Sequence, residues 1–260
     1  MKRIRVIPIL GIQNGNLVKT VRFKGANYLG DPINAIRIYN EKEVDEIGVV
    51  DIRSSIENKE PNYRLIEEMA GECFMPLSYG GGITTLDIAK KVFDLGVEKL
   101  IFNSATMEDF KLIKEVSGLY GDQSTVVSVD VKKTWLGKQK VAFYSGSKNI
   151  QKDVVVFAKE LAESGAGELI IHSVDNDGTF SGYDLDIIST ISTSVSLPTI
   201  ALGGARNIKD FLNAVEIGKA SAVAASSMFS YKNQDFKSIL INYPSQNELI
   251  DQFYSKLSEV

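Results

Sequence analysis

The chain has 260 residues, of which 24% are charged, and a formal net charge of −4. This mildly acidic, well-mixed charge favours neither a nucleic-acid partner nor a membrane partner. The length suits one large α/β domain, which we expect to span residues 1–260. Because Cys73 is the only cysteine, an intrachain disulfide is excluded, and we predict a cytoplasmic protein.

Short apolar runs rich in β-branched residues recur along the chain and predict strands. They cover residues 4–10, 46–52, 74–79, 98–103, 124–130, 167–175, 197–202 and 221–226. Helical patterns lie between most of these runs, for example at residues 84–96, 153–165 and 207–218. Eight apolar strands that alternate with helices predict a parallel sheet closed into a (β/α)8 TIM barrel. An open doubly wound sheet is the alternative, but the Gly-rich dinucleotide turn typical of that fold is missing after the first strand.

Two polar segments interrupt this alternation, at residues 17–32 and 131–149. Each follows a predicted barrel strand, so each would lie over the C-terminal mouth of the barrel. Barrels of this kind place their sites at the mouth. We therefore expect both segments to cover a binding site.

The chain also contains an internal repeat. Residues 80–105 align with residues 202–227 without a gap, at a constant spacing of 122 residues. The alignment places Gly96 on Gly218. A repeat of this size predicts two similar half-barrels, and therefore two equivalent sites on opposite sides of the mouth.

In each half, a Gly-Gly turn follows a strand and precedes a helix, and a small residue ends the next strand. The first cradle consists of Gly81, Gly82, Asn103 and Ser104. The second cradle consists of Gly203, Gly204, Ala225 and Ser226. Glycines let backbone N–H groups approach an anion, and helix N-termini carry partial positive charge. A tight turn would explain one such glycine pair, but two symmetric pairs predict a ligand with two phosphates.

Alternation along the strands predicts which side chains face the barrel axis. The predicted inward charges at the base are Arg5, Glu46, Lys99 and Glu168. Aliphatic residues such as Ile7, Ile101 and Ile170 would follow them. Near the mouth the predicted inward residues are Asn103, Asp130 and His172. Two positive and two negative residues can be buried together because they neutralise one another, and a structural salt-bridge cluster is the favoured interpretation at this point.

With these residues placed, the chain resembles the cyclase subunit of imidazole glycerol phosphate synthase across nearly its whole length. The matching stretches are NGNLVKTVRF, the GDP at Gly30–Pro32, YGGGI, FNSA, YSGSKN, GAGELIIHSVDNDGTFSGYD and LGGA. The combination of DNDGTFSGYD with both cradles is specific. A related isomerase of the same pathway shares the half-barrel repeat but lacks this combination of loops.

In that family, a glutaminase docked at the N-terminal face of the barrel supplies ammonia. The ammonia crosses a hollow barrel interior to a bisphosphorylated ribulosyl substrate at the mouth. The resemblance implies that the four base charges form the ammonia gate. It implies phosphate or substrate contacts at Gly82, Asn103, Ser104, Asp177, Gly178, Gly204 and Ser226. It also implies that Lys19 belongs to a mobile loop, that Asp130 is one of two catalytic aspartates, and that no metal or cofactor is required.

Two residues depart from the family pattern. Gly11 stands where the family carries its other catalytic aspartate, and His172 stands where a small hydroxyl residue is usual. General acid–base groups commonly contribute on the order of 10²–10⁴ in rate, so ordinary cyclisation should be impaired. An imidazole titrates near about 6.5 and could take over proton transfer. A hydrogen-bonded lining residue is the other interpretation of His172.

Three functions stay open at this point. The first is a divergent synthase subunit that keeps the ammonia passage and the glutaminase partner but serves another phosphorylated or sugar-type acceptor. Family members with such divergence are associated with bacterial surface-polysaccharide sugars. The second is an authentic histidine-pathway cyclase that tolerates Gly11, and the third is a noncatalytic scaffold that activates a glutaminase. A retained gate with a lost carboxylate favours the first.

Overall fold

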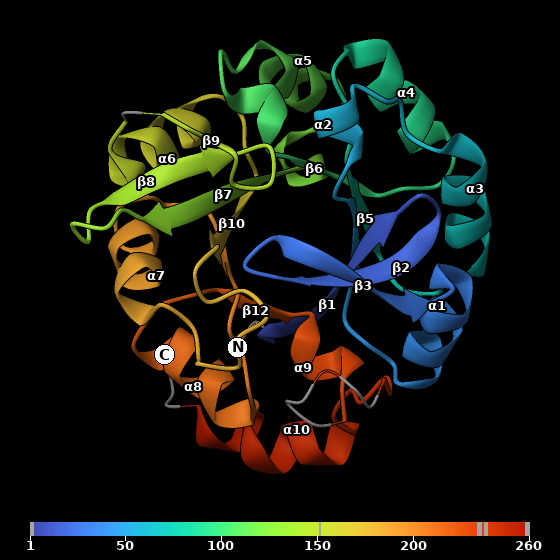
Figure 1. The fold of residues 1–260 in the computed structure, drawn as a ribbon, viewed down its shortest axis with the longest axis vertical. Helices are drawn as coiled ribbons and strands as arrows, with labels where there is room; N and C mark the ends of the chain where they lie inside the picture. Colours follow the sequence, from blue (N-terminus) through green and yellow to red (C-terminus); the bar gives the residue numbers. More distant parts are fainter. Residues whose placement is uncertain (1–2, 151, 233–235, 237–238, 258–260) are drawn as a thin grey trace.

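The computed structural model describes residues 3–150, 152–232, 236 and 239–257. Within these residues, eight parallel strands form a closed barrel surrounded by helices (Figure 1). In chain order the barrel strands are β1 (Arg5–Gln13), β4 (Ile47–Asp51), β5 (Leu77–Gly80), β6 (Lys99–Phe102), β7 (Thr125–Lys133), β10 (Glu168–Ser173), β11 (Thr199–Leu202) and β12 (Ala222–Ala225). The predicted (β/α)8 barrel is confirmed.

The barrel closes where β7 pairs with β10, since these strands lie at the two ends of the order β10, β11, β12, β1, β4, β5, β6, β7. This pairing places Glu168 beside Val126 and His172 beside Asp130. Because the barrel strands run in one direction, their first residues gather at one end, the base. Their last residues gather at the other end, the mouth.

Helices cover the outside of the barrel. The longer ones are α1 (Pro32–Glu41), α3 (Tyr63–Glu72), α4 (Leu86–Asp94), α5 (Lys111–Tyr120), α6 (Val154–Glu163), α7 (Leu185–Ser192) and α8 (Ile208–Glu216). The shorter ones are α2 (Ser54–Glu57), η1 (Ser104–Thr106), η2 (Asp122–Ser124), α9 (Ser227–Ser230), α10 (Gln246–Gln252) and η3 (Tyr254–Lys256). Polar residues start several helices: Thr85 caps α4, and Asn207 forms a capping box with Asp210 at α8. In the described part of the chain, no helix has the length and apolar character needed to span a bilayer.

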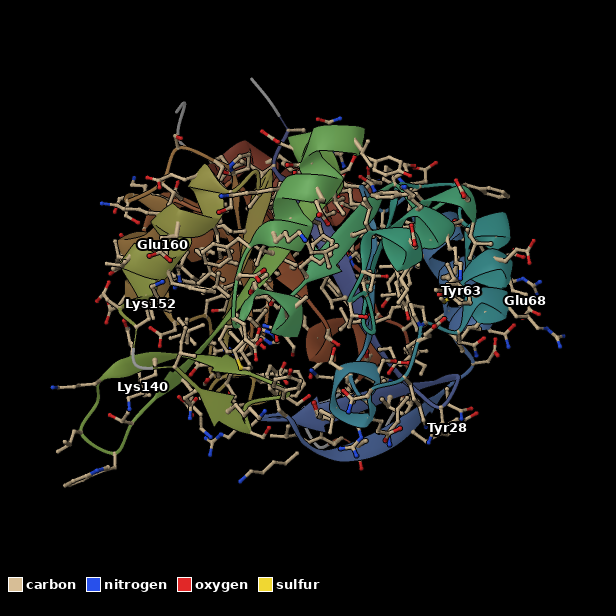
Figure 2. The ribbon with its side chains drawn as sticks, turned by 90° about the horizontal axis from the view of Figure 1, so that it is seen from above. Tyr28, Tyr63, Glu68, Lys140, Lys152 and Glu160 are labelled. Atoms are coloured by element: carbon tan, nitrogen blue, oxygen red, sulfur yellow. The ribbon has the colours of Figure 1, made fainter. Side chains whose placement is uncertain are left out.

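Two antiparallel extensions cover the mouth, as the two polar segments predict. β1 continues into β2 (Asn16–Val21) and β3 (Lys24–Gly30), and β7 continues into β8 (Gln139–Phe143) and β9 (Lys148–Asn149). Figure 2 shows Tyr28 of β3 and Lys140 of β8 at the same end of the molecule. The backbone N–H of Arg22 donates to the carbonyl oxygen of Asp177 at 2.9 Å. The β2–β3 hairpin is therefore tied to the segment that follows β10.

The internal repeat is confirmed by the element boundaries. β11 and α8 begin and end 122 residues after β5 and α4. The glycine turns match as well: a Cβ at Gly81 would lie 2.7 Å from the carbonyl oxygen of Asp51, and a Cβ at Gly203 would lie 2.7 Å from that of Ser173. Both positions also have a positive φ, +121° and +98°. Each turn therefore requires glycine.

Gly203→Ala is expected to lower the free energy of unfolding by about 2 kcal/mol or more. The new Cβ meets a carbonyl oxygen, and the positive φ strains an alanine. Chemical denaturation measures the change. Gly118→Ala is the matched control because nothing lies within 4 Å of a Cβ at this position of α5. The control should be neutral or stabilising by up to about 1 kcal/mol, and equal effects of the two variants would contradict the close approach at Gly203.

Buried hydrophobic side chains form two separate clusters. The larger cluster joins the outward faces of the strands to the helices, and it includes Val6, Ile36 and Phe157. The smaller cluster lies inside the barrel and consists of Ile7, Ile101, Val126, Ile170, Ile200, Leu202, Ala222 and Ala224. Ile7, Ile101 and Ile170, which alternation predicts to face inward, all belong to the smaller cluster.

The expectation of a hollow interior is wrong for this conformation. Ile7, Ile101 and Ile170 are at most 6% exposed and pack together inside the barrel. They lie two residues beyond Arg5, Lys99 and Glu168 on the same strands, so they form a layer between the base charges and the mouth. Barrels of this fold fill their interiors with layered side chains. A molecule that crosses the barrel must displace this aliphatic layer.

The predicted strand at residues 74–79 begins too early. β5 starts at Leu77, and Phe74 is 87% exposed at the base. The side chain of Asn40 accepts a hydrogen bond from the backbone N–H of Phe74 at 3.1 Å. This tertiary contact holds Phe74 outside the sheet, and its apolar character alone does not reveal it.

Candidate functional site

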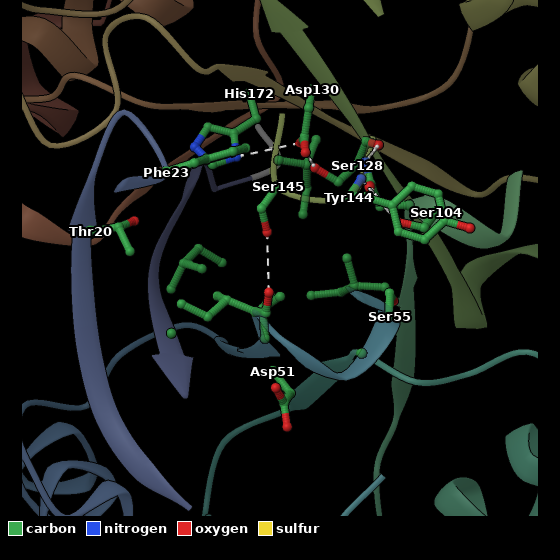
Figure 3. A pocket seen from close by; sticks show the side chains of 18 of the residues that line it. Thr20, Phe23, Asp51, Ser55, Ser104, Ser128, Asp130, Tyr144, Ser145 and His172 are labelled. Carbon is green, nitrogen blue, oxygen red and sulfur yellow. Dashed lines mark hydrogen bonds and ion pairs between the residues drawn. The ribbon is translucent and has the colours of Figure 1, made fainter. Parts of the chain in front are cut away.

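A cavity of about 170 Å³ opens at the mouth of the barrel. Its walls come from the ends of barrel strands and from both antiparallel extensions, which contribute Lys19 and Tyr144. Figure 3 shows Asp130 and His172 on one side of this cavity and Asp51 on the other. The mouth therefore contains a cavity lined by acid–base groups, among them Lys19, Asp130 and His172, and their role in a functional site stays a prediction.

The first cradle opens onto this mouth cavity. Its residues Gly81, Gly82, Asn103 and Ser104 all line the cavity. Asn103 Nδ2 donates to the carbonyl oxygen of Ser128 at 2.9 Å, and Ser104 Oγ donates to Asn103 Oδ1 at 3.3 Å. These bonds fix the two polar side chains beside the glycine turn. The glycine turn and the polar groups therefore face one space large enough for a small ligand.

The second cradle borders a much smaller cavity than the first. It borders a separate cavity of only about 10 Å³. This small cavity is lined by Gly178, Gly203, Gly204 and Ser226, and also by Asp177, Phe180, Leu202 and Ser227. Asp177, Leu202 and Ser226 line the mouth cavity as well. The two half-barrels therefore have matching backbones at their cradles, but the cavities beside the two cradles differ in volume.

A series of charged groups runs along the wall of the mouth cavity. Lys19 Nζ lies 2.8 Å from Asp177 Oδ1, and His172 Nε2 lies 3.5 Å from the same oxygen. His172 Nδ1 lies 3.5 Å from Asp130 Oδ1, which accepts a 2.7 Å hydrogen bond from Ser128 Oγ. The two histidine contacts are ion-pair distances, too long for strong hydrogen bonds. The structure therefore brings Lys19, Asp130 and His172 together at one site.

The charges of this series support one another. Burial opposes the charge on the imidazole, but the carboxylates of Asp130 and Asp177 outweigh it and raise the pKa of His172 to about 9. Burial also opposes ionisation of Asp177, yet Lys19 and His172 hold the pKa of that carboxyl below its ordinary value. At neutral pH the imidazole is therefore a partly buried cation between two carboxylates, which suits a proton donor better than a base.

His172→Gln is expected to lower the free energy of unfolding most below pH 6.5 and progressively less toward pH 9. The raised pKa means that the protonated imidazole stabilises the fold fully below its unfolded value of about 6.5, and that this contribution is lost as the pH rises through about 9. The difference between wild type and variant should change by at most about 3 kcal/mol. Denaturation at a series of pH values measures it.

The pH dependence of this stability difference can be assigned to His172, because it is the only histidine in the chain. No second imidazole can therefore produce the same pH dependence. A difference between wild type and His172→Gln that stays constant from pH 6 to pH 10 would contradict a charged imidazole.

The same charges hold the β2–β3 hairpin over the mouth. Lys19 is 8% exposed, and Phe23 at the hairpin tip packs edge-on against His172 with ring centroids 4.9 Å apart. Arg22 Nε donates to the carbonyl oxygen of Asp175 at 3.0 Å. The side chain of Asp177 is thus engaged with Lys19, and its implied substrate contact stays a prediction.

Gly11 lies on β1 and lines the mouth cavity. A Cβ at this position would lie 3.1 Å from the carbonyl oxygen of Val18 on β2, a tight contact that a small shift of the hairpin would relieve. The cavity wall therefore lacks a carboxylate on β1, whereas Asp130 and His172 stand on β7 and β10.

Among the described residues, no group of three or more His, Cys, Asp or Glu side chains could hold a metal ion.

At the base, the four inward charges form a closed ring. Arg5 lies 2.6 Å from Glu46 and 3.0 Å from Glu168, while Lys99 lies 2.9 Å and 3.4 Å from the same two glutamates. Burial opposes the charge on Glu46, but Lys99 and Arg5 outweigh it and lower its pKa below the ordinary value. The predicted mutual neutralisation is confirmed, and each cation bridges both carboxylates.

Sequence reasoning missed two contributors to these sites. Ser78 Oγ donates to Glu46 Oε1 at 2.8 Å, so a serine on β5 completes the base ring. Strand alternation carries a signal for this residue, because it aligns with Lys99 across the β5–β6 pair. Phe23 has no such signal, since its contact with His172 arises only when the hairpin folds over the mouth.

Comparison with known protein families adds to this geometry. A family model described as "Histidine biosynthesis protein" matches residues 5–234. The chain belongs to this family. The matched span contains the base ring, both cradles and the charged series at the mouth, so the histidine biosynthesis protein family covers every candidate site residue.

Relatives within the family match over nearly their full lengths. A Pseudomonas aeruginosa protein named "Putative imidazole glycerol phosphate synthase subunit hisF2" is 46% identical over 96% of this chain and 99% of its own. A Leptospira borgpetersenii protein named "Putative imidazole glycerol phosphate synthase subunit HisF" is 46% identical over 94% and 96%. An Endomicrobium trichonymphae protein named "Imidazole glycerol phosphate synthase subunit HisF" is 36% identical over 99% of each chain.

Proposed function

We propose that this chain is the ammonia-accepting synthase subunit of a glutamine amidotransferase complex. Ammonia enters at the base from a glutaminase partner and reaches a phosphorylated or sugar-type acceptor at the mouth. The observation that carries this proposal is the position of the closed charge ring and the mouth cavity at opposite ends of one barrel. The names of the relatives, which are synthase subunits, support the same assignment.

Exposed apolar side chains at the base support a protein partner there. Phe74 lies just before β5 and is 87% exposed. Leu119, near the end of α5, is 59% exposed, and Ile217, just after α8, is 56% exposed. All three lie at the end of the barrel where the strands begin. Exposed apolar groups at one face are typical of an interaction site. We assign this face to the glutaminase.

The base ring has the composition that an ammonia gate needs. Glu168 Oε2 is buried and has no hydrogen-bond partner among the described residues, so it can accept a hydrogen bond from ammonia. The longest contact of the ring joins Lys99 to Glu168 at 3.4 Å. Movement of Lys99 away from Glu168 would open the ring next to this free acceptor. The aliphatic layer beyond the ring then favours an uncharged molecule.

At the mouth, we assign the phosphate of the acceptor to Gly82, Asn103 and Ser104 of the first cradle. The protonated imidazole of His172 lines the same cavity and can donate a proton to an oxygen of the acceptor as ammonia adds. The carboxylate of Asp130 holds the imidazole in its charged form. In this arrangement His172 supplies a proton-transfer group in a cavity whose β1 wall carries no carboxylate.

Two further assignments rest on residues alone and stay predictions. The lost carboxylate at Gly11 favours an acceptor other than the histidine-pathway substrate, and surface-polysaccharide sugar biosynthesis is the setting we predict. The alternative is an authentic histidine-pathway cyclase, which the similarity to the Endomicrobium trichonymphae protein favours. A noncatalytic scaffold for a glutaminase is disfavoured because it would leave the charged mouth cavity without a role.

The test of the proposed function combines two measurements. In the first, purified chain receives the bisphosphorylated ribulosyl substrate and excess ammonium salt, and the imidazole product is followed. We expect turnover about 10²-fold or more below that of the Endomicrobium trichonymphae protein assayed in parallel. In the second, glutamine hydrolysis by the co-expressed glutaminase should rise when this chain is added. Equal cyclase rates would support the histidine alternative, and no stimulation of the glutaminase would contradict the complex.

Phe74→Asp should abolish the stimulation of the glutaminase, because a charge in place of an exposed apolar side chain on the base face opposes docking. Trp135→Asp is the matched control: Trp135 is 92% exposed but lies on the turn between β7 and β8 at the mouth. Glutaminase activity against concentration of each variant gives the comparison. If Trp135→Asp lost the stimulation of the glutaminase and Phe74→Asp kept it, the partner would dock at the mouth, and its assignment to the base would be wrong.

A further inference from the structure

The β7–β8 hairpin ends in a turn that presents two apolar side chains to solvent. Trp135 is 92% exposed and Leu136 is 64% exposed. The backbone N–H of Gly137 donates to the carbonyl oxygen of Thr134 at 2.9 Å, and the backbone N–H of Thr134 donates to the carbonyl oxygen of Lys138 at 2.8 Å. Trp135 and Leu136 are therefore the two central residues of a hydrogen-bonded turn, which fixes both of them at the tip.

The turn itself does not require these two side chains. Gly137 supplies the positive φ that a three-residue hairpin loop needs, at +77°. A large apolar side chain in water adds little to stability, because it buries almost no area. Figure 2 shows the hairpin, beside the label of Lys140, projecting from the mouth end of the molecule. Adjacent exposed apolar side chains at a projecting tip indicate a contact surface.

The same hairpin carries a local excess of positive charge that the net charge of the chain conceals. Residues 131–150 contain five lysines and no acidic residue, whereas the whole chain has 33 acidic residues and 29 lysines and arginines. Lys133 is paired, since its Nζ lies 2.6 Å from Asp184 Oδ2. Within the described residues, no ion pair neutralises Lys132, Lys138 or Lys140. The overall charge is therefore a poor guide to this end of the molecule.

Two of the unpaired lysines face each other across the hairpin. Lys132 lies directly opposite Lys140 in the antiparallel β7–β8 pair. Val131 and Val141, the neighbouring opposite pair, are buried in the larger apolar cluster, so alternation places the two lysines on the other face. Like charges at directly opposite positions destabilise a hairpin. An anionic surface against this face would relieve the repulsion.

The order of these groups along the hairpin matches the layers of an anionic bilayer. Tryptophan favours the boundary between hydrocarbon and headgroups, where its ring is apolar and its N–H stays wet. Lysines set back from the tip reach lipid phosphates with their ammonium groups while their stems cover apolar surface. The other mouth extension presents Tyr28, which is 63% exposed, at the same end of the molecule (Figure 2). An acidic protein would need a groove shaped to this tip, whereas a bilayer offers both layers everywhere.

We propose that the β7–β8 hairpin binds the surface of membranes that contain anionic lipids. Trp135 and Leu136 enter the boundary of the hydrocarbon, and Lys132, Lys138 and Lys140 contact lipid phosphates. The contact is shallow and reversible, because two apolar side chains bury less area than a single acyl chain. The barrel mouth then lies toward the membrane and the base stays free. This inference goes beyond the proposed function and does not depend on it.

The test uses the intrinsic fluorescence of the full chain. Trp135 is the only tryptophan, so the emission reports on the hairpin alone. The protein is titrated with vesicles of phosphatidylcholine and, in parallel, with vesicles of an equal mixture of phosphatidylcholine and phosphatidylglycerol. We expect the emission to shift to shorter wavelength, and the protein to cosediment, with the mixed vesicles only. Added salt should weaken the binding because it screens exposed charges.

Lys132→Gln and Lys140→Gln should each weaken binding to the mixed vesicles by about fivefold. Each should also raise the midpoint of thermal unfolding, because it removes one member of a repelling pair. Lys219→Gln is the matched control, since Lys219 is exposed between α8 and β12 at the base, and it should leave vesicle binding unchanged. Trp135→Asp should abolish cosedimentation, because it replaces the inserted ring with a negative charge.

Three results would overturn the membrane proposal. The first is the absence of both a spectral shift and cosedimentation with the mixed vesicles. The second is cosedimentation that persists unchanged in Trp135→Asp and in both lysine variants, because another surface would then carry it. The third is a spectral shift with poly-L-glutamate but not with vesicles, which would assign the hairpin to an acidic protein. None of these results bears on the proposed function, because no vesicle enters its tests.

Discussion

Lys99→Met should uncouple ammonia delivery from glutamine hydrolysis. Lys99 bridges both glutamates of the base ring, at 2.9 Å from Glu46 and 3.4 Å from Glu168. Its removal leaves Arg5 alone to neutralise the buried carboxylate of Glu46 and the partly buried carboxylate of Glu168, so the ring opens or admits water. We expect the glutaminase to keep hydrolysing glutamine while product formation at the mouth falls by about tenfold or more relative to glutamine used.

The same substitution should also destabilise the protein. Removing one partner of a buried charge network typically costs about 3–5 kcal/mol in the free energy of unfolding, because a charge is left without compensation. Lys159→Met on the exposed face of α6 is the control and should be near neutral. Turnover with added ammonium salt, which reaches the mouth from solvent, separates a gate from a general loss of activity. If glutamine-dependent and ammonium-dependent turnover fall together, the ring is a structural cluster.

Gly11→Asp should raise cyclisation of the bisphosphorylated ribulosyl substrate by on the order of 10²-fold or more. The substitution supplies the missing carboxylate, and a Cβ at this position must displace the carbonyl oxygen of Val18, 3.1 Å away, by only a few tenths of an ångström.

The matched control is Gly11→Asn, which has nearly the same shape but no acid–base group. Product formation by the two variants, compared with that of the wild type, shows whether the carboxylate or the added volume carries the gain. No gain in Gly11→Asp would mean that the mouth differs from the family in more than this position.

Alternation and repetition made the barrel and the base ring predictable. Arg5, Glu46, Lys99 and Glu168 each stand at the start of a predicted strand, and the ion pairs they form follow from their charges once the barrel closes. The pairing of β7 with β10 likewise brings His172 beside Asp130. These features depend on which face of the sheet a side chain occupies, and the two-residue alternation along a strand determines that face.

Features that depend on side-chain packing between distant parts of the chain were not predictable in the same way. The period indicates that Ile7 and Ile101 face the axis, but not that they pack into a closed layer. The exposure of Phe74 depends on a hydrogen bond from a distant residue, Asn40. The packing of Phe180 beside the second cradle is likewise a tertiary feature that no local pattern reveals.

The aliphatic layer around Ile7 and Ile170 offers side chains without a single polar atom. Ions shed their water shells at great cost to enter such surroundings, whereas neutral ammonia does so readily. Nitrogen would then leave its proton behind at the base and reach the mouth as the neutral nucleophile, which adds to the acceptor while His172 protonates the oxygen of the acceptor. The barrel would exclude ammonium ions, so that the supply would follow the concentration of neutral ammonia on the glutaminase side, which falls as that side becomes more acidic.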